Sequence, residues 1–156
     1  MTRGNDPYGA GLTDEPPAGS GQNFPRMISV LLLFNNPFDL DRICRRLEKN
    51  QNIIVDIRVS EEDAIHLMHY VPFDVIVTEY LASEPDRTWF LRTIRGRSID
   101  IPVIYYLLPS ETPPEEETRP YAPVYFIIRS PDAAAREADE LYPAIIRAVA
   151  EYPLGP

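Results

Sequence analysis

Five short apolar runs alternate along the chain with segments of helical periodicity. The runs cover residues 28–34, 53–59, 75–79, 101–108 and 124–128. Most are apolar almost throughout, which is typical of strands buried on both faces. Strands that alternate with helices form a parallel sheet with helices on both sides. With right-handed crossovers, the natural closure is a doubly wound, flavodoxin-like sheet of five strands in the order 2-1-3-4-5.

Capping signals predict the first three helices. Pro37 can open the first, which runs from there with one apolar stripe. Ser60 is a plausible N-cap for the second, which should continue to about Tyr70. The third is expected from about Arg87 to Ile94, with Gly96 closing it.

The pattern weakens toward the end of the chain. Residues 109–123 contain five prolines, so the fourth helix should be weak or lost. Ser130, Pro131 and Asp132 form a helix start with a cap, an N1 proline and an acidic first turn. Pro143 should kink this last helix or split it in two.

The chain divides into one domain and two tails. Residues 1–26 are rich in glycine and proline without apolar periodicity, so we expect a disordered tail. Residues 27–152 form the domain, and residues 153–156 are a short tail. Because the sequence ends four residues after Tyr152, we expect a standalone domain without an output domain.

Charge and cysteine usage narrow the class of function. The net charge is −9 and no basic stripe is visible, which argues against nucleic-acid binding. The arginines cluster on two predicted helices, at 42, 45 and 46 and at 92, 95 and 97, and we interpret both clusters as solvated faces. Cys44 is the only cysteine, so no disulfide or thiolate zinc cluster is expected. No signal peptide or membrane span is indicated, and we expect a cytoplasmic protein.

The carboxyl ends of the strands are where a parallel sheet of this kind binds ligands. Here they carry one carboxylate, Glu79. Gly96 is the only glycine between Met27 and Pro153, so a glycine-rich phosphate loop is absent. His66 and His69 with Glu62 could bind a metal on one helix face, but polar helix surface is the favoured interpretation.

Several stretches together resemble the receiver domain of two-component response regulators, over about residues 27–152. They are ISVLLLFNNP, VSEEDAIHLM, PFDVIVTEYLASEPDRTWFLRTIR, IPVIYYL and VYFIIRSPD. They follow one another in the order and spacing of that family. The residues of the apolar segments are particularly similar to those of receivers of methanogenic archaea. The resemblance implies the flavodoxin-like receiver fold and a role in phosphorelay signal transduction.

The residues that the family uses for phosphoryl chemistry are replaced here. The resemblance places Phe34 and Asn35 at the two acidic positions that hold Mg²⁺, and Glu79 at the phosphoaccepting aspartate. Leu107 stands at the switch threonine or serine, and Arg129 at the strand-five lysine. The aromatic switch position is Phe126, and the loop after the acceptor is reduced to residues 82–85.

These replacements predict a degenerate receiver that binds no metal or other cofactor and is not an enzyme. Mg²⁺ prefers near-octahedral oxygen ligands, and Glu79 is the only carboxylate left among these positions. Leu107 has no hydroxyl to bind a phosphoryl oxygen. Glu79 either imitates a phosphorylated aspartate or pairs with Arg129 and holds the fold together, and we favour the ion pair.

We therefore expect a phosphorylation-independent module that binds a protein partner, a histidine kinase or another signalling protein, with an oligomeric state that the sequence does not define. Residues 109–123 are either a recognition loop that presents Glu115, Glu116 and Glu117 to a basic partner or a solvated connector. Two alternatives stay open. One is a working phosphoacceptor receiver with Glu79 as acceptor and Arg129 in place of lysine. The other is a sensor whose emptied pocket is lined by Phe34, Leu107 and Tyr80.

Overall fold

The computed structural model describes residues 26–80, 86, 88–129 and 137–152. The tail before residue 26, the loop 81–85, the expected helix start at 130–132 and the last four residues lie outside this description. The strands are β1 Ile28–Leu33, β2 Ile53–Arg58, β3 Val75–Glu79, β4 Val103–Leu107 and β5 Val124–Ile128. The helices are α1 Pro37–Glu48, α2 Glu61–Met68, α3 Trp89–Gly96, α4 Glu115–Thr118, the 3-10 turn η4 Arg119–Tyr121, and α5 Glu137–Glu151.

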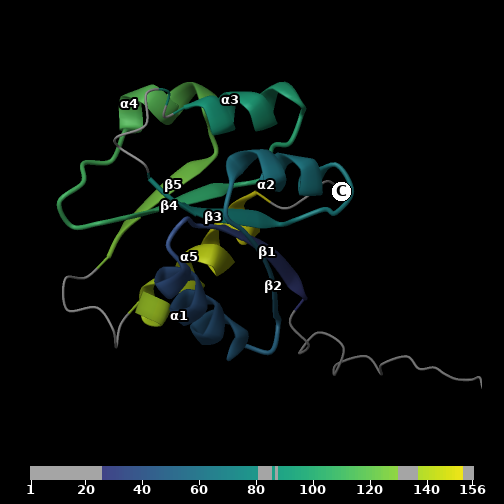
Figure 1. The fold of residues 1–156 in the computed structure, drawn as a ribbon, viewed down its shortest axis with the longest axis vertical. Coiled ribbons are helices and arrows are strands. Elements are labelled where there is room, and N and C mark those ends of the chain that lie inside the picture. The colour runs from purple at the N-terminus through teal and green to yellow at the C-terminus, as the bar shows by residue number, and fades with distance from the viewer. Residues whose placement is uncertain (1–25, 81–85, 87, 130–136, 153–156) are drawn as a thin grey trace, which may run out of the picture.

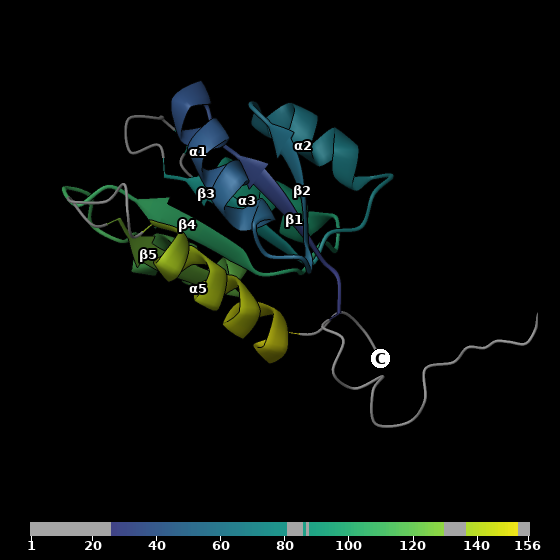
Figure 2. The same cartoon turned by 90° about the horizontal axis from the view of Figure 1, so that it is seen from below.

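The five strands form one parallel sheet in the order β2-β1-β3-β4-β5, which confirms the predicted topology. Figure 1 shows α1 and α5 on one face of the sheet and α2, α3 and α4 on the other. Figure 2, turned by 90°, shows α1 and α5 side by side, and the two helices are in contact. No helix among the described residues is both long enough and apolar enough to cross a bilayer.

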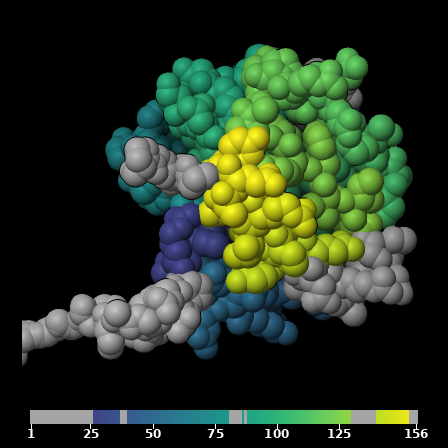
Figure 3. All heavy atoms as spheres, turned by 180° about the vertical axis from the view of Figure 1, so that it is seen from behind, coloured from purple at the N-terminus to yellow at the C-terminus, as the bar shows by residue number. Residues whose placement is uncertain are grey.

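Two apolar cores follow from the alternation of side chains along each strand. In β1, Val30 and Leu32 join the core under α1 and α5, while Leu31 and Leu33 join the core under α2 and α3. From behind, α5 occupies the middle of its face, and its yellow atoms lie against the purple residues near the start of β1 (Figure 3). Both faces of the central strands are therefore covered, as their continuous apolar sequence predicts.

The start of α2 confirms its predicted N-cap. The Ser60 hydroxyl accepts a 3.1 Å hydrogen bond from the backbone N–H of Asp63. The end of α3 differs from the prediction in one respect: Gly96 is the last residue of the helix, and the residue with a left-handed backbone is Ser98, with φ of 63°. The Ile99 N–H bonds the carbonyl of Ile94, and both side chains belong to the same apolar core. Packing of the partly buried Ile99 against this core thus sets the turn two residues later than the glycine.

The last helix corrects a second expectation. α5 runs without a break from Glu137 to Glu151 with Pro143 inside it, so the proline does not split it. Leu141 before the proline and Ile145 after it are both buried against the sheet. We infer that this packing on both sides of Pro143 offsets the lost backbone hydrogen bond.

The weak fourth helix is confirmed. α4 has only four residues and leads directly into η4. The segment is nevertheless anchored, because Thr118 is buried and its hydroxyl donates 2.8 Å to the carbonyl of Pro114. Arg95 on α3 holds the following turn through the carbonyls of Tyr121 and Pro123, at 2.8 and 3.0 Å.

Arg95 also corrects the interpretation of the second arginine cluster as a solvated face. Besides the two bonds to the η4–β5 turn, its guanidinium donates 2.8 Å bonds to the carbonyls of Ile99 and Ile101. Burial lowers the pKa of Arg95 from its usual value. This side chain therefore ties the end of α3 to the entries of β4 and β5.

Candidate functional site

The strand ends bring the predicted positions together at one edge of the sheet. In the register of the sheet, Leu33 lies opposite Thr78, and Glu79 lies opposite Tyr106. The Arg129 N–H then bonds the Leu107 carbonyl at 2.8 Å. The ends of β1, β3, β4 and β5 are thus neighbours, as the topology requires.

Side-chain alternation divides these positions between the two faces of the sheet. Phe34 packs in the core under α1 and α5, and Arg129, two residues after Ile127 of the same core, has the same parity. Leu107 and Phe126 belong to the opposite core, under α2 and α3. Phe126 stacks there on Tyr105, with ring centroids 6.0 Å apart.

Arg129 is buried, with 7% of its surface exposed, and its guanidinium lies against two aromatic rings. Its guanidinium carbon lies 4.5 Å from the ring centroid of Tyr106 and 5.7 Å from that of Phe34. The two rings meet edge to face, with centroids 6.5 Å apart. A guanidinium is more weakly hydrated than an ammonium and stacks on aromatic faces, so this environment suits arginine better than lysine.

Tyr106 is the site residue that the sequence analysis missed. It lies within the run of residues 101–108, where it reads as one more core side chain. The only sequence signal that Tyr106 belongs to the site was its position one residue before Leu107. Side chains next to a strand end can contact the ends of neighbouring strands. Its role depends on the registers of β3, β4 and β5, which the sequence alone does not give.

Glu79 has a different partner from the one expected. Its Oε2 accepts a 2.6 Å hydrogen bond from the backbone N–H of Asn35, in the turn between β1 and α1. The ion pairs found among the described residues do not include one between Glu79 and Arg129. The favoured ion pair is therefore not formed in this structure: the Glu79 carboxylate bonds the β1–α1 turn, and the Arg129 guanidinium contacts the two aromatic rings.

The resemblance to receiver domains implies a magnesium site at this edge, and the residues present do not fit one. Phe34 is fully buried and apolar, and Asn35 uses its main-chain N–H toward Glu79 rather than offering an acidic ligand. The described residues contain no group of three or more His, Cys, Asp or Glu side chains placed to hold a metal ion. We derive no metal-dependent step for this site.

The histidine hypothesis on α2 is also not supported. The Nε2 of His69 lies 3.0 Å from Nη1 of Arg97, and the ring of His66 contacts Tyr70 edge to face at 5.4 Å between centroids. Neither histidine belongs to a metal-binding group within the described part of the chain. The two rings are part of a polar and aromatic surface on α2.

A pocket of about 230 Å³ lies beside Glu79, but its lining is not the predicted one. Its walls come from the ends of β1, β2 and β3 and the start of α2: Leu33, Asn35, Val59, Ser60, Glu61, Glu62, Thr78 and Glu79. Phe34, Leu107 and Tyr80 are all buried, and Tyr80 packs edge to face on Tyr105. The expected apolar pocket is therefore filled by the packing of these side chains.

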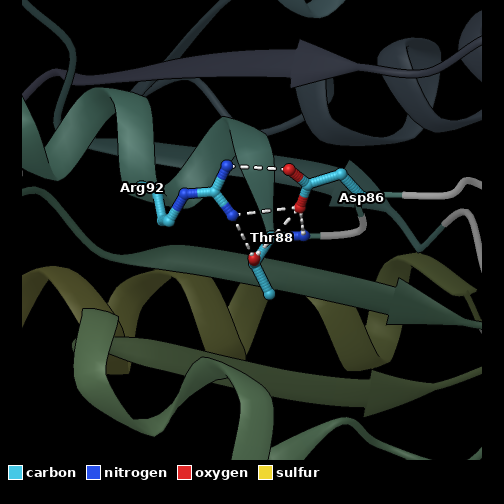
Figure 4. A network of polar contacts seen from close by, with 3 residues as sticks. All are labelled: Asp86, Thr88 and Arg92. Carbon is cyan, nitrogen blue, oxygen red and sulfur yellow. Dashed lines mark hydrogen bonds and ion pairs between the residues drawn. The ribbon is translucent and has the colours of Figure 1, made fainter.

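A polar network fixes the chain where it enters α3 (Figure 4). Arg92 donates to both carboxylate oxygens of Asp86, at 2.7 and 3.1 Å, and to the Thr88 hydroxyl at 3.0 Å. The Thr88 N–H also donates to Asp86, at 3.3 Å. The hydrogen bond from Arg92 lowers the pKa of Asp86 below its usual value. The helix consequently begins at Trp89, two residues later than predicted.

Comparison with known proteins identifies the fold. Neither a scan against protein-family models nor a search of curated proteins gives a match. Among solved structures, the response regulator domain of CheB from Thermotoga maritima is similar with a TM-score of 0.66 and 19% identity, covering 80% of this chain and 98% of that one. The receiver domain of the Francisella response regulator 1452 is similar with a TM-score of 0.64 and 19% identity, covering 80% of this chain and 98% of that one.

A third solved structure agrees with these two. The N-terminal domain of a response regulator/sensory box/GGDEF 3-domain protein from Carboxydothermus hydrogenoformans gives a TM-score of 0.64 and 19% identity, covering 80% of this chain and 95% of that chain. The molecule therefore has the flavodoxin-like fold of response-regulator receiver domains. At this level of identity the likeness describes the fold, and the function must be argued from the site.

Proposed function

We propose that this chain is a degenerate receiver that acts as a protein-interaction module in two-component (phosphorelay) signal transduction, without phosphoryl chemistry of its own. The observation that carries the proposal is the burial of Arg129 against the rings of Tyr106 and Phe34. In a phosphoryl-transfer site, metal ions and cations must reach the equatorial oxygens of the transferred group. Here the guanidinium of Arg129 is buried and lies against two rings, so we propose that it stabilises the packing of the domain instead.

The other strand-end positions support the same reading. Phe34 offers no oxygen where the family has a metal-binding carboxylate, and Leu107 offers no hydroxyl. Glu79 already accepts a hydrogen bond from Asn35, so it links β3 to the β1–α1 turn. We propose that this link holds one fixed arrangement of the strand ends, independent of any phosphodonor.

The test is intact-mass measurement after incubation of the full chain with acetyl phosphate and Mg²⁺. We expect no added phosphoryl group, while a receiver with an intact acidic site, treated in parallel, gains one. Glu79→Asp is the matched control variant, because it restores the usual acceptor and leaves Phe34 in place. It too should stay unmodified. A phosphoryl group on Glu79 of the natural sequence would contradict the proposal and support the phosphoacceptor alternative.

The partner surface that we propose is the acidic segment at α4. Glu115, Glu116 and Glu117 are exposed in a short helix anchored by Thr118. A hollow of about 440 Å³ lies beside them, lined by Tyr80 and residues 112–117. Exposed carboxylates next to proline and tyrosine surface suit a basic segment of a histidine kinase or another signalling protein.

Titration of the purified chain with the phosphotransfer domain of a candidate histidine kinase tests this surface. Glu115→Lys with Glu116→Lys should abolish binding that is sensitive to salt, whereas Glu62→Lys with Asp63→Lys, a matched reversal on α2, should preserve it. Equal losses from the two pairs would place the recognition elsewhere. This outcome would leave the phosphoryl test unaffected, so the two parts of the proposal fail separately.

A further inference from the structure

β2 is an edge strand, and one of its two sides is not paired with another described strand. Among the described strands it pairs with β1 alone, at one end of the sheet (Figure 1). Three apolar side chains on or just after it are exposed: Ile54 by 49%, Ile57 by 37% and Val59 by 54%. Exposed edges of this kind usually carry blocking charges, bulges or prolines. The charges here are Asp56 and Arg58, which have opposite sign.

The backbone groups of β2 that face outward can be identified from its bonds to β1. The Ile28 N–H bonds the Asn52 carbonyl at 2.8 Å, and the Phe34 N–H bonds the Arg58 carbonyl at 3.2 Å. Because parallel pairing uses alternate residues, the even-numbered residues of β2 face β1. The N–H and C=O groups of Val55, Ile57 and Val59 therefore point away from the sheet.

One of these outward groups already takes a substitute donor. The Ile57 carbonyl accepts a 2.6 Å hydrogen bond from Nη1 of Arg58, its own neighbour in the chain. Asp56 has no hydrogen bond or ion pair within the described part of the chain. At this edge the Ile57 carbonyl is therefore bonded by the side chain of Arg58. The Asp56 carboxylate does not contact Arg58, although the two residues are two positions apart.

We propose that β2 is a homodimer interface, in which the β2 edges of two copies pair antiparallel about a two-fold axis at Ile57. In this register Ile57 faces Ile57 of the second copy, and each exchanges its N–H and C=O with the other. Val55 faces Val59, so the exposed side chain of Val59 is buried against the partly buried Val55. Asp56 faces Arg58 in both directions, so the interface contains two symmetric ion pairs.

The charges select this register over its neighbours. A shift by one residue would bring together backbone groups that already bond β1. The next register, centred on Val55, uses the outward groups but sets Asp56 against Ile54 and Arg58 against Asn52. It forms neither ion pair. Only the axis at Ile57 satisfies both the backbone groups and the charges.

Charge reversal with sedimentation equilibrium of the full chain tests the proposal. The natural sequence should form a concentration-dependent dimer. Asp56→Arg and Arg58→Asp should each weaken dimerisation about tenfold or more, because two ion pairs become two like-charge contacts. The double variant Asp56→Arg with Arg58→Asp should regain affinity within about threefold of the natural sequence, since the swapped charges again face each other. Unchanged thermal melting of the diluted variants would show that each folds.

Two results would overturn the proposal. One is a chain that stays monomeric at the highest concentration tested. The other is a double variant that dimerises as weakly as the single reversals, because the charges would then not face each other across the interface.

Disulfide trapping gives a second readout, in a Cys44→Ala background. Ile57→Cys should cross-link two copies under oxidised glutathione, because paired residues of this kind have Cα atoms about 5.5 Å apart, within the range for disulfides. Val55→Cys is the matched control and should not cross-link, since its opposite residue is Val59. Cross-linking through position 55 but not through position 57 would overturn the register.

Discussion

The burial of Arg129 against aromatic rings predicts which residues are energetically coupled at the strand ends. The perturbation is a double-mutant cycle on the free energy of unfolding, with Tyr106→Leu and Arg129→Met as the two changes. The guanidinium carbon lies 4.5 Å from the Tyr106 ring centroid, and Arg129 is only 7% exposed. Desolvated contacts of this geometry contribute about 1–2 kcal/mol, so we expect a coupling free energy of that size.

A parallel cycle with Glu79→Ala and Arg129→Met tests the arrangement that the sequence favoured. A buried ion pair would show in the loss of about 3–5 kcal/mol when one partner is removed. Because Glu79 bonds the Asn35 N–H instead, we expect a coupling below about 0.5 kcal/mol, as for side chains that share no contact.

Urea denaturation measures both cycles. Tyr106→Phe is the control, because it keeps the ring and should keep the coupling with Arg129. A larger coupling for Glu79 than for Tyr106 would refute the structural reasoning and restore the ion pair.

Three further predictions concern stability and reactivity. Arg95→Lys should lower the free energy of unfolding by about 2–3 kcal/mol in urea denaturation, since an ammonium cannot reach four carbonyls in two segments; a loss under about 1 kcal/mol would contradict the bridging role. Burial, and secondly the charge of Glu48, raises the pKa of Cys44 to about 11, so alkylation by iodoacetamide at pH 8 should be roughly 100-fold slower than for a free thiol, and an equal rate would argue against this environment. Because Arg92 lowers the pKa of Asp86, its stabilisation of the α3 start is present at neutral pH and is lost as the pH falls through that lowered pKa; hydrogen exchange at the α3 start should show this loss, and Asp86→Asn should remove the pH dependence.

The fold was predictable because its signals are local. Most strands are nearly continuous apolar runs, and the helix before or after each carries its own cap or stripe, so the order of elements follows without knowledge of contacts. The proline-rich composition of residues 109–123 was enough to predict a weak fourth helix. Two of the errors share a physical cause, since core packing of the partly buried Ile99 and burial of Leu141 with Ile145 outweighed the local preferences of Gly96 and Pro143.

The contacts of the site were less predictable, because they depend on pairs that are distant in sequence. The positions of Phe34, Glu79 and Arg129 at the strand ends follow from the strand pattern. Their partners do not: Arg129 meets Tyr106 through the register of neighbouring strands, and Glu79 meets a backbone N–H that no side-chain pattern reveals. Opposite charges suggested an ion pair, and aromatic packing provided the alternative.

The central claim is that the strand-end site of this receiver fold does not respond to Mg²⁺ or to a phosphoryl group. The most direct measurement is a ¹H–¹⁵N NMR titration of the chain with Mg²⁺ and then with beryllofluoride, a phosphoryl mimic. We predict that the backbone signals of Glu79, Phe126 and α5 stay in place. Shifts that spread from Glu79 through Phe126 to α5 would reveal an intact switch and contradict the account.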